Sequence, residues 1–177
     1  MLAQLTIVQC QLVSTLGDAN LDAAILTQPQ QILTGLDWMP FAAEPLVIIS
    51  PPGTQGLSDT ELLTRFPFVQ FKRQTWIAQS INAELKARNI KIRSAMEIDS
   101  LESISLMVAE GLGVSIVPLR SHGQSLKHKL VVTPFGSKPL KRIVGILQRS
   151  SNPRAEFIRL FHGILKSLNN EKTGLPA

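Results

Sequence analysis

The chain has 177 residues, 44% of them hydrophobic and 18% charged, with a net charge of +5. This length is enough for one domain or two small lobes to bury about two thirds of the unfolded surface without a metal or disulfide staple. The single cysteine, Cys10, cannot form an internal disulfide, and no run reaches the roughly 18 apolar residues of a membrane helix. With no basic n-region or cleavage site at the amino terminus, the sequence predicts a cytoplasmic protein without a membrane partner.

The positive charge is concentrated near the carboxyl end. Residues 1–50 contain no Lys or Arg, whereas residues 120–177 carry eleven bases and two acids. The bases in residues 154–172 lie on the polar positions of an amphipathic helix, whereas its aromatic residues, Phe157 and Phe161, belong to the apolar stripe and do not alternate with the bases on one face. This pattern favours a solvated helix face over direct binding of nucleic acid by this chain.

The first third of the chain predicts short strands and little helix. A strand at residues 5–8 and a helix at 11–18 precede a buried strand that ends at Leu26. Residues 44–50 are a continuous apolar run, which is typical of a strand covered on both faces. Pro51, Pro52 and Gly53 end that strand.

The middle of the chain alternates strands with helices. Thr75 caps a helix in which Ile77, Ile81 and Leu85 recur, and Asn89 can end that helix in a left-handed conformation. The remaining elements are strands at 66–71, 91–96 and 114–117, and a helix that follows residue 99. This order predicts an α/β unit with parallel strand pairing.

Either Asp99 or Ser100 can cap the second of these helices. With Asp99 as the cap, Glu102 takes the capping-box position. Gly111 stops the helix before Gly113 and a short apolar strand. The residues expected on one apolar helix face are Leu101, Ile104, Val108 and Leu112.

The last third predicts a polar loop or poorly defined helix at 119–129, strands at 130–135 and 142–147, and a helix opened by Asn152 and Pro153. The apolar stripe of that helix is a core or interface face. The strands at 45–50 and 142–147 bracket the α/β unit, and we expect both to cross between lobes. Residues 1–50 with 139–177 then form a first lobe and residues 51–138 a second, and a cleft between lobes is a preferred place for a small-molecule pocket.

Catalysis finds little support in the sequence. His122 and His128 lie in a polar loop and His162 on a basic helix, and no metalloprotease, nucleophile-elbow, C-x-x-C or Gly-rich phosphate motif occurs. Gly111-Leu-Gly113 lacks the third glycine and the following helix of a dinucleotide fingerprint. We therefore expect no enzymatic activity, no catalytic residue, no metal and no cofactor.

Binding of a small organic acid finds better support. Cations, amides, an aromatic ring and a helix start meet at Gln70, Phe71, Lys72, Arg73 and Thr75, although a solvated connection with Phe71 in the core also fits. Asp99 and Ser100 begin the next helix, with simple capping as the alternative. Because the charges of Asp99 and Glu102 compete with an acidic ligand, selectivity is expected from Lys72, Arg73 and Ser100.

Six motifs in order resemble the effector-binding domain of LysR-type transcriptional regulators. The resemblance covers almost the whole chain from about residue 12 onward. The motifs are Asn20-Leu-Asp-Ala-Ala-Ile25, Gly35-Leu-Asp-Trp-Met-Pro40, Glu44-Pro-Leu-Val-Ile-Ile-Ser-Pro51, Pro67-Phe-Val-Gln-Phe71, Asp99-Ser-Leu-Glu102 and Val108-Ala-Glu-Gly-Leu-Gly-Val-Ser-Ile-Val-Pro118.

This resemblance implies a two-lobed fold like that of type 2 periplasmic binding proteins, with a small-molecule effector in the interlobe cleft of a homodimer or tetramer. It implies ligand contacts from Thr27 and Gln28, for which ordinary loop polarity is the alternative, and from the two helix starts. The full implied set is Thr27, Gln28, Gln70, Phe71, Lys72, Arg73, Thr75, Ile98, Asp99, Ser100 and Leu101.

The chain departs from the family pattern at its amino end. The winged helix-turn-helix and linker helix are not present, and the first lobe is expected to be truncated by about two elements. DNA contact would then require a helix-turn-helix domain absent from this chain. Two other functions share the scaffold: a solute-binding protein of a transport system, which the missing export signal disfavours, and an enzyme.

Overall fold

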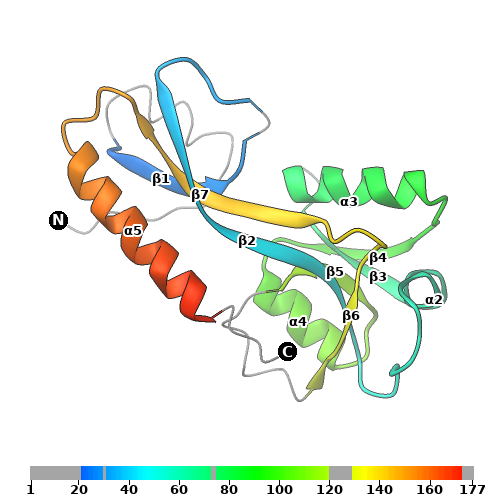
Figure 1. The fold of residues 1–177 in the computed structure, drawn as a ribbon. Coiled ribbons are helices and arrows are strands. Elements are labelled where there is room, and N and C mark those ends of the chain that lie inside the picture. The colour runs from blue at the N-terminus through cyan, green and yellow to red at the C-terminus, as the bar shows by residue number, and fades with distance from the viewer. Residues whose placement is uncertain (1–20, 30, 73–74, 120–128, 173–177) are drawn as a thin grey trace. The chain divides into compact units, whose positions relative to one another are not determined.

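The computed structural model describes residues 21–29, 31–72, 75–119 and 129–172. They form a mixed α/β fold that divides into two compact units, one comprising residues up to Ala43 together with those from Arg142, the other Glu44–Lys141 (Figure 1). The boundary at Ala43 falls inside β2 (Leu36–Ser50), and the boundary at Arg142 falls after the first residue of β7 (Lys141–Arg149). The predicted strand at 5–8, the helix at 11–18 and most of the loop at 119–129 lie outside the described residues.

The first unit is built on β1 (Ala23–Thr27), which pairs antiparallel with β7 from Ala23↔Gln148 to Thr27↔Val144. Helix α5 (Ala155–Lys172) follows Asn152, whose side-chain oxygen accepts a hydrogen bond from the Arg154 amide at 2.9 Å. On this helix Ile158 is buried, whereas most of the predicted apolar stripe is exposed. No helix in the described ranges is long and apolar enough to cross a membrane.

The second unit contains two groups of strands. The carboxyl half of β2 pairs antiparallel with β5 (Ser115–Pro118) and β6 (Val131–Pro134), and β3 (Pro67–Phe71) pairs parallel with β4 (Arg93–Ile98). A parallel bridge between Phe68 and Val114 joins the two groups. The helices are α2 (Asp59–Arg65), α3 (Trp76–Ala87) and α4 (Leu101–Ala109).

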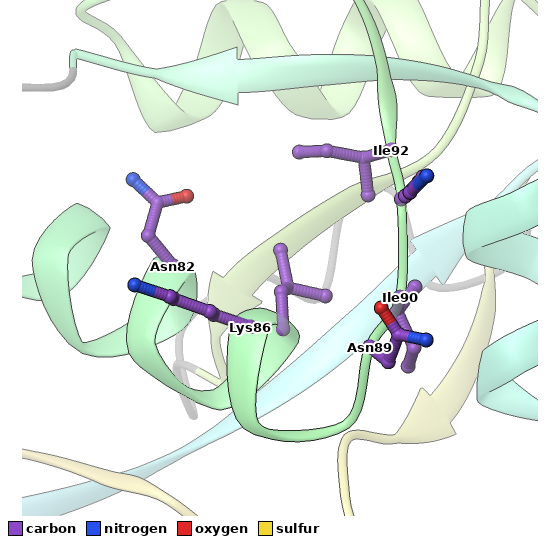
Figure 2. Close-up of a pocket in the computed structure, with 7 residues that line it drawn as sticks. Asn82, Lys86, Asn89, Ile90 and Ile92 are labelled. Carbon is purple, nitrogen blue, oxygen red and sulfur yellow. The ribbon is translucent and has the colours of Figure 1, made fainter.

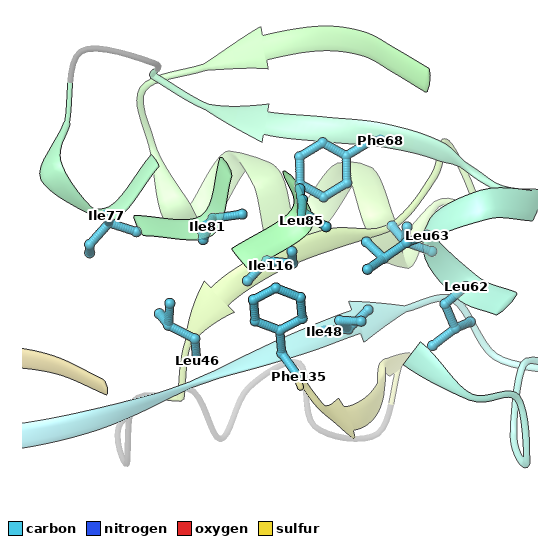
Figure 3. Packing of buried hydrophobic residues seen from close by; sticks show 11 residues of the cluster. Leu46, Ile48, Leu62, Leu63, Phe68, Ile77, Ile81, Leu85, Ile116 and Phe135 are labelled. Atoms are coloured by element: carbon cyan, nitrogen blue, oxygen red, sulfur yellow. The ribbon is translucent and has the colours of Figure 1, made fainter. Parts of the chain in front are cut away.

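Alternate residues of β2 face two different apolar clusters. Leu46 and Ile48 pack with the buried side chains of α2 and α3 (Figure 3), whereas Val47 and Ile49 pack with those of α4. Both faces of the strand are therefore covered, which explains why residues 46–49 are all apolar. Helices α2 and α3 cover one face of β2, and helix α4 covers the other.

Several details differ from the sequence predictions. Strand β2 begins at Leu36 and not at residue 44. Helix α2 was not predicted, although Ser58 and Glu61 form a capping box at its start. Leu112 does not extend the apolar face of α4, because the helix ends at Ala109 and leaves that side chain 47% exposed. The third strand of the predicted parallel unit pairs in parallel with β3 only at Val114, and its remainder, β5, pairs antiparallel with β2.

Candidate functional site

Two paired parallel strands of the second unit end side by side, and each is followed by a helix. Gln70 is opposite Glu97 and Phe71 is opposite Ile98 in the β3–β4 ladder, and the Lys72 amide donates to the Ile98 carbonyl at 3.1 Å. Helix α3 begins five residues after Phe71, and α4 begins three residues after Ile98. Because the first N–H groups of a helix lack intrahelical partners, this edge concentrates backbone donors, as in ligand sites of open α/β sheets.

Thr75 caps α3, as the sequence predicts. Its hydroxyl oxygen accepts from the Ala78 amide at 3.3 Å, and the hydroxyl donates to the Lys72 carbonyl at 3.0 Å. The Thr75 amide also donates to that carbonyl, at 3.3 Å. Two hydrogen bonds therefore join Thr75, at the start of α3, to the carbonyl of Lys72, directly after β3.

Ser100, not Asp99, caps α4. The Ser100 hydroxyl oxygen accepts from the Ser103 amide at 3.3 Å, and the hydroxyl lies 3.2 Å from a carboxylate oxygen of Glu102. The alternative in which Asp99 caps the helix and Glu102 completes a capping box is therefore not realised. Asp99 is exposed beside this helix start, where its carboxylate adds negative charge.

The other predicted residues of this edge are largely packed inside. Gln70 is 6% exposed and its side-chain oxygen accepts from the Ser94 hydroxyl at 3.3 Å. Phe71, Ile98 and Leu101 are partly buried against the cluster that includes Val69 and the α4 side chains. These three apolar side chains form a half-buried apolar surface at the base of the helix starts. Lys72 is exposed, and Arg73 lies outside the described residues.

Thr27 and Gln28 lie in the first unit. Thr27 is the last residue of β1, opposite Val144 of β7, and the Gln28 amide donates to the Ile143 carbonyl at 2.8 Å. The Gln28 side chain is exposed at the strand end. The strand end that the sequence predicts at this point is present, and the ligand contact of these two residues stays a prediction.

Ser94 is a residue of this region that the sequence analysis missed. It lies on β4 and its hydroxyl orients the buried Gln70 side chain. The half-exposed alternation at residues 91–96 gave no signal for this contact, because the pairing that brings Ser94 beside Gln70 depends on the β3–β4 register, with its irregularity between Phe68 and Val69.

Comparison with known proteins identifies the same family that the sequence motifs resemble. The model of the LysR substrate binding domain matches residues 4–169. A curated relative, "Probable RuBisCO transcriptional regulator" of Cyanidium caldarium, is 28% identical over 167 residues, which are 88% of this chain and 53% of the relative. The chain thus spans about half the length of that relative.

Solved structures share the fold. The reduced form of the OxyR regulatory domain from Pseudomonas aeruginosa is 27% identical with a TM-score of 0.73, and the match covers 96% of this chain and 80% of that one. The effector binding domain of QuiR in complex with shikimate has a TM-score of 0.74 at 14% identity, covering 91% and 79%. The fold is therefore the periplasmic-binding-protein-like fold of these domains, and the regulator interpretation is favoured over a transport protein. This chain belongs to the LysR substrate binding domain family.

Proposed function

We propose that this chain is the sensory module of a LysR-type transcription regulator and that it binds a small, anionic metabolite at the β3–β4 edge. The observation that carries the proposal is the pairing of two parallel strand ends with two capped helix starts, at Thr75 and Ser100. Backbone N–H groups and the positive end of each helix dipole favour negative charge there. Lys72, exposed between the two, supplies a full positive charge.

Within this proposal the residues have different roles. Lys72 and Ser100 contact the anionic group, with Arg73 as a second cation. Phe71, Ile98 and Leu101 provide an apolar surface for the body of the ligand, because they are only partly buried in their cluster. Gln70 acts through Ser94 and the strand end, since its side chain is almost fully buried. A ligand contact of Thr27 and Gln28 is implied by the family resemblance alone and stays a prediction.

The ligand acts as a signal and is not turned over. In this proposal the domain is cytoplasmic, works as a homodimer or tetramer and reaches DNA through a helix-turn-helix in a separate domain. Effector binding changes promoter contact only if the ligand has different affinities for two arrangements of the subunits.

The ligand class can be tested by calorimetry with shikimate, the ligand bound in the QuiR structure, and with a panel of amino acids and other small carboxylates. For any acid that binds, Lys72→Ala and Ser100→Ala should each weaken affinity by about 1–3 kcal/mol, the range for a lost hydrogen bond to a charged group. Lys129→Ala, which removes an exposed charge from another segment, is the control. Unchanged affinity in both site variants would remove this edge from the binding site.

A further inference from the structure

A hollow lies at the carboxyl end of helix α3, in the second unit. Its volume is about 310 Å³, at the lower end of the range for small-molecule sites. Asn82, Leu85 and Lys86 line it from the helix, and residues 89–92 line it from the segment that leads to β4. Figure 2 shows the two groups on opposite sides of the hollow, with the ends of the Asn82 and Lys86 side chains directed away from the segment that carries Asn89, Ile90 and Ile92. This hollow is separate from the β3–β4 edge, since it lies where α3 ends and not where it begins.

The walls of the hollow are held in place by the helix end. Asn89 adopts a left-handed conformation with φ of 53°, and the amides of Asn89 and Ile90 donate to the carbonyls of Lys86 and Leu85 at 3.1 and 2.9 Å. This is a Schellman-type cap, which satisfies carbonyls that a helix end otherwise leaves free. The segment after the helix is therefore fixed against it, and the hollow exists before any ligand arrives.

The floor of the hollow is apolar. Leu85 is 4% exposed, and Ile90 and Ile92 are partly buried against the larger core cluster of this unit. The exposed parts of these two isoleucines are the surface that a ligand would cover. Removing apolar surface from water is favourable in proportion to its area, so the floor favours a ligand with an apolar body.

The rim is polar and cationic. Asn82, Lys86, Asn89 and Lys91 are exposed. No carboxylate lines the hollow. The ammonium groups of Lys86, on the helix side, and Lys91, on the side of the following segment, offset the partial negative charge of the α3 carboxyl end. Each can donate a charge-assisted hydrogen bond to a carboxylate whose apolar body covers the floor.

From this arrangement we infer that the end of α3 is a second binding site of the domain, for a small organic carboxylate of about the size of benzoate. The site does not depend on the β3–β4 edge. It gives the second unit a place where a metabolite can stabilise the junction between α3 and β4.

Methyl NMR on protein labelled at isoleucine tests the inference, with sodium benzoate as the probe. The methyl signals of Ile90 and Ile92 should shift in a saturable way. The double variant Lys86→Gln with Lys91→Gln should weaken benzoate about fivefold or more, whereas benzyl alcohol, which keeps the ring without the charge, should bind wild type and variant equally. The matched control is Lys129→Gln with Lys166→Gln, which removes the same charge from exposed positions elsewhere.

The outcomes separate this site from the β3–β4 edge. Lys72→Ala and Ser100→Ala should leave the Ile90 and Ile92 shifts unchanged, whether or not they affect another ligand. The inference is overturned if benzoate leaves both methyl signals in place, or if the Lys86 and Lys91 double variant binds benzoate as tightly as the control double variant. Circular dichroism melting of both double variants confirms that each is folded at the temperature of the titration.

Discussion

Asp59 and Arg88 form an ion pair that joins the start of α2 to the end of α3. Nη1 of Arg88 lies 2.7 Å from Oδ2 of Asp59, and Nη2 donates to Oδ1 at 2.9 Å. The Gly136 amide also donates to Oδ2, at 2.9 Å, and the guanidinium lies 5.7 Å from the centre of the Phe135 ring. The side chains are only 16% and 25% exposed, so this carboxylate connects three segments of the second unit in a partly desolvated setting.

Replacing Asp59 with Asn should destabilise the second unit. The variant leaves Arg88 without its counter-ion and weakens the bond to the Gly136 amide, and breaking a partly buried pair from one side leaves a desolvated charge. We expect a loss of about 2–3 kcal/mol in the free energy of unfolding. Urea unfolding followed by circular dichroism measures it.

The control for this substitution is Asp22→Asn in the first unit. Asp22 also pairs with an arginine, Arg154, at 2.8 Å, but the two side chains are 46% and 68% exposed. Exposed pairs contribute little, so this variant should change the unfolding free energy by less than about 1 kcal/mol. Equal losses in the two variants would mean that burial does not determine the strength of these pairs.

The same carboxylate makes stability depend on acid pH. The Arg88 guanidinium, above all through its hydrogen bond, lowers the pKa of Asp59 from 3.8 to about 2, with burial acting in the opposite direction. Because the folded pKa is depressed, the stabilisation is present above pH 3.8 and is lost as the pH falls from there towards 2. The loss should reach about 2 kcal/mol. Unfolding free energies measured across this window should fall less steeply in Asp59→Asn, and parallel pH profiles would contradict the assignment.

Gly113 should not tolerate any side chain. An added Cβ would lie 2.3 Å from the Pro67 carbonyl oxygen, which also accepts the Val114 amide at 2.9 Å, and the backbone φ is 152°. Backbone cannot move away as a flexible side chain can, so Gly113→Ala should cost about 3 kcal/mol or more and loosen the join between β3 and the residues before β5. Thermal unfolding by calorimetry provides the measurement.

Gly163 gives the matched comparison on α5. It is exposed, within the helix, and an added Cβ would have no neighbour within 4 Å. Gly163→Ala should therefore raise stability by about 1 kcal/mol through helix propensity alone. If both glycine variants shift the unfolding temperature in the same direction, the close approach at Gly113 does not limit the fold.

Apolar periodicity predicted the core of the second unit well. The run at 44–50 marked a strand covered on both faces, and Ile77, Ile81 and Leu85 marked the buried face of α3, because burial constrains these residues directly. Helix α2 was missed although its Ser58 and Glu61 capping box was readable, since its apolar pair, Leu62 and Leu63, is too short to show a helical period. The strand β2 was predicted to begin at residue 44, because Pro40 interrupts the pattern of its first half.

The candidate site was predictable in place but not in detail. Strand ends and caps are local, so Thr75 and the neighbourhood of Ser100 could be placed from sequence. The choice between Asp99 and Ser100 could not, because either residue caps a helix well and the backbone geometry decides between them. The burial of Gln70 and its bond to Ser94 depend on strand register, which sequence alone does not fix.

Substitutions at Ser100 can separate capping from ligand contact. Ser100→Ala removes the acceptor for the Ser103 amide, so it should cost about 1 kcal/mol of stability and also weaken an anionic ligand. Ser100→Asp keeps a good cap but places a carboxylate where the ligand's own carboxylate would approach. It is made together with Glu102→Gln, because the Glu102 carboxylate lies 3.2 Å from the Ser100 hydroxyl and would repel the aspartate. Its stability should therefore stay within about 0.5 kcal/mol of Glu102→Gln alone, while affinity for the acid falls at least as far as in Ser100→Ala.

Paired measurements of unfolding free energy and binding affinity on the two variants decide the question. If Ser100 serves only as a cap, Ser100→Asp will bind the acid as Glu102→Gln alone does. If Ser100 touches the ligand, the aspartate variant will be the more stable of the two and the weaker binder of the acid. Its carboxylate caps α4 and, from the same position, repels the anion. A neutral ligand analogue lacking the carboxylate should lose little affinity in Ser100→Asp, since the repulsion acts between charges.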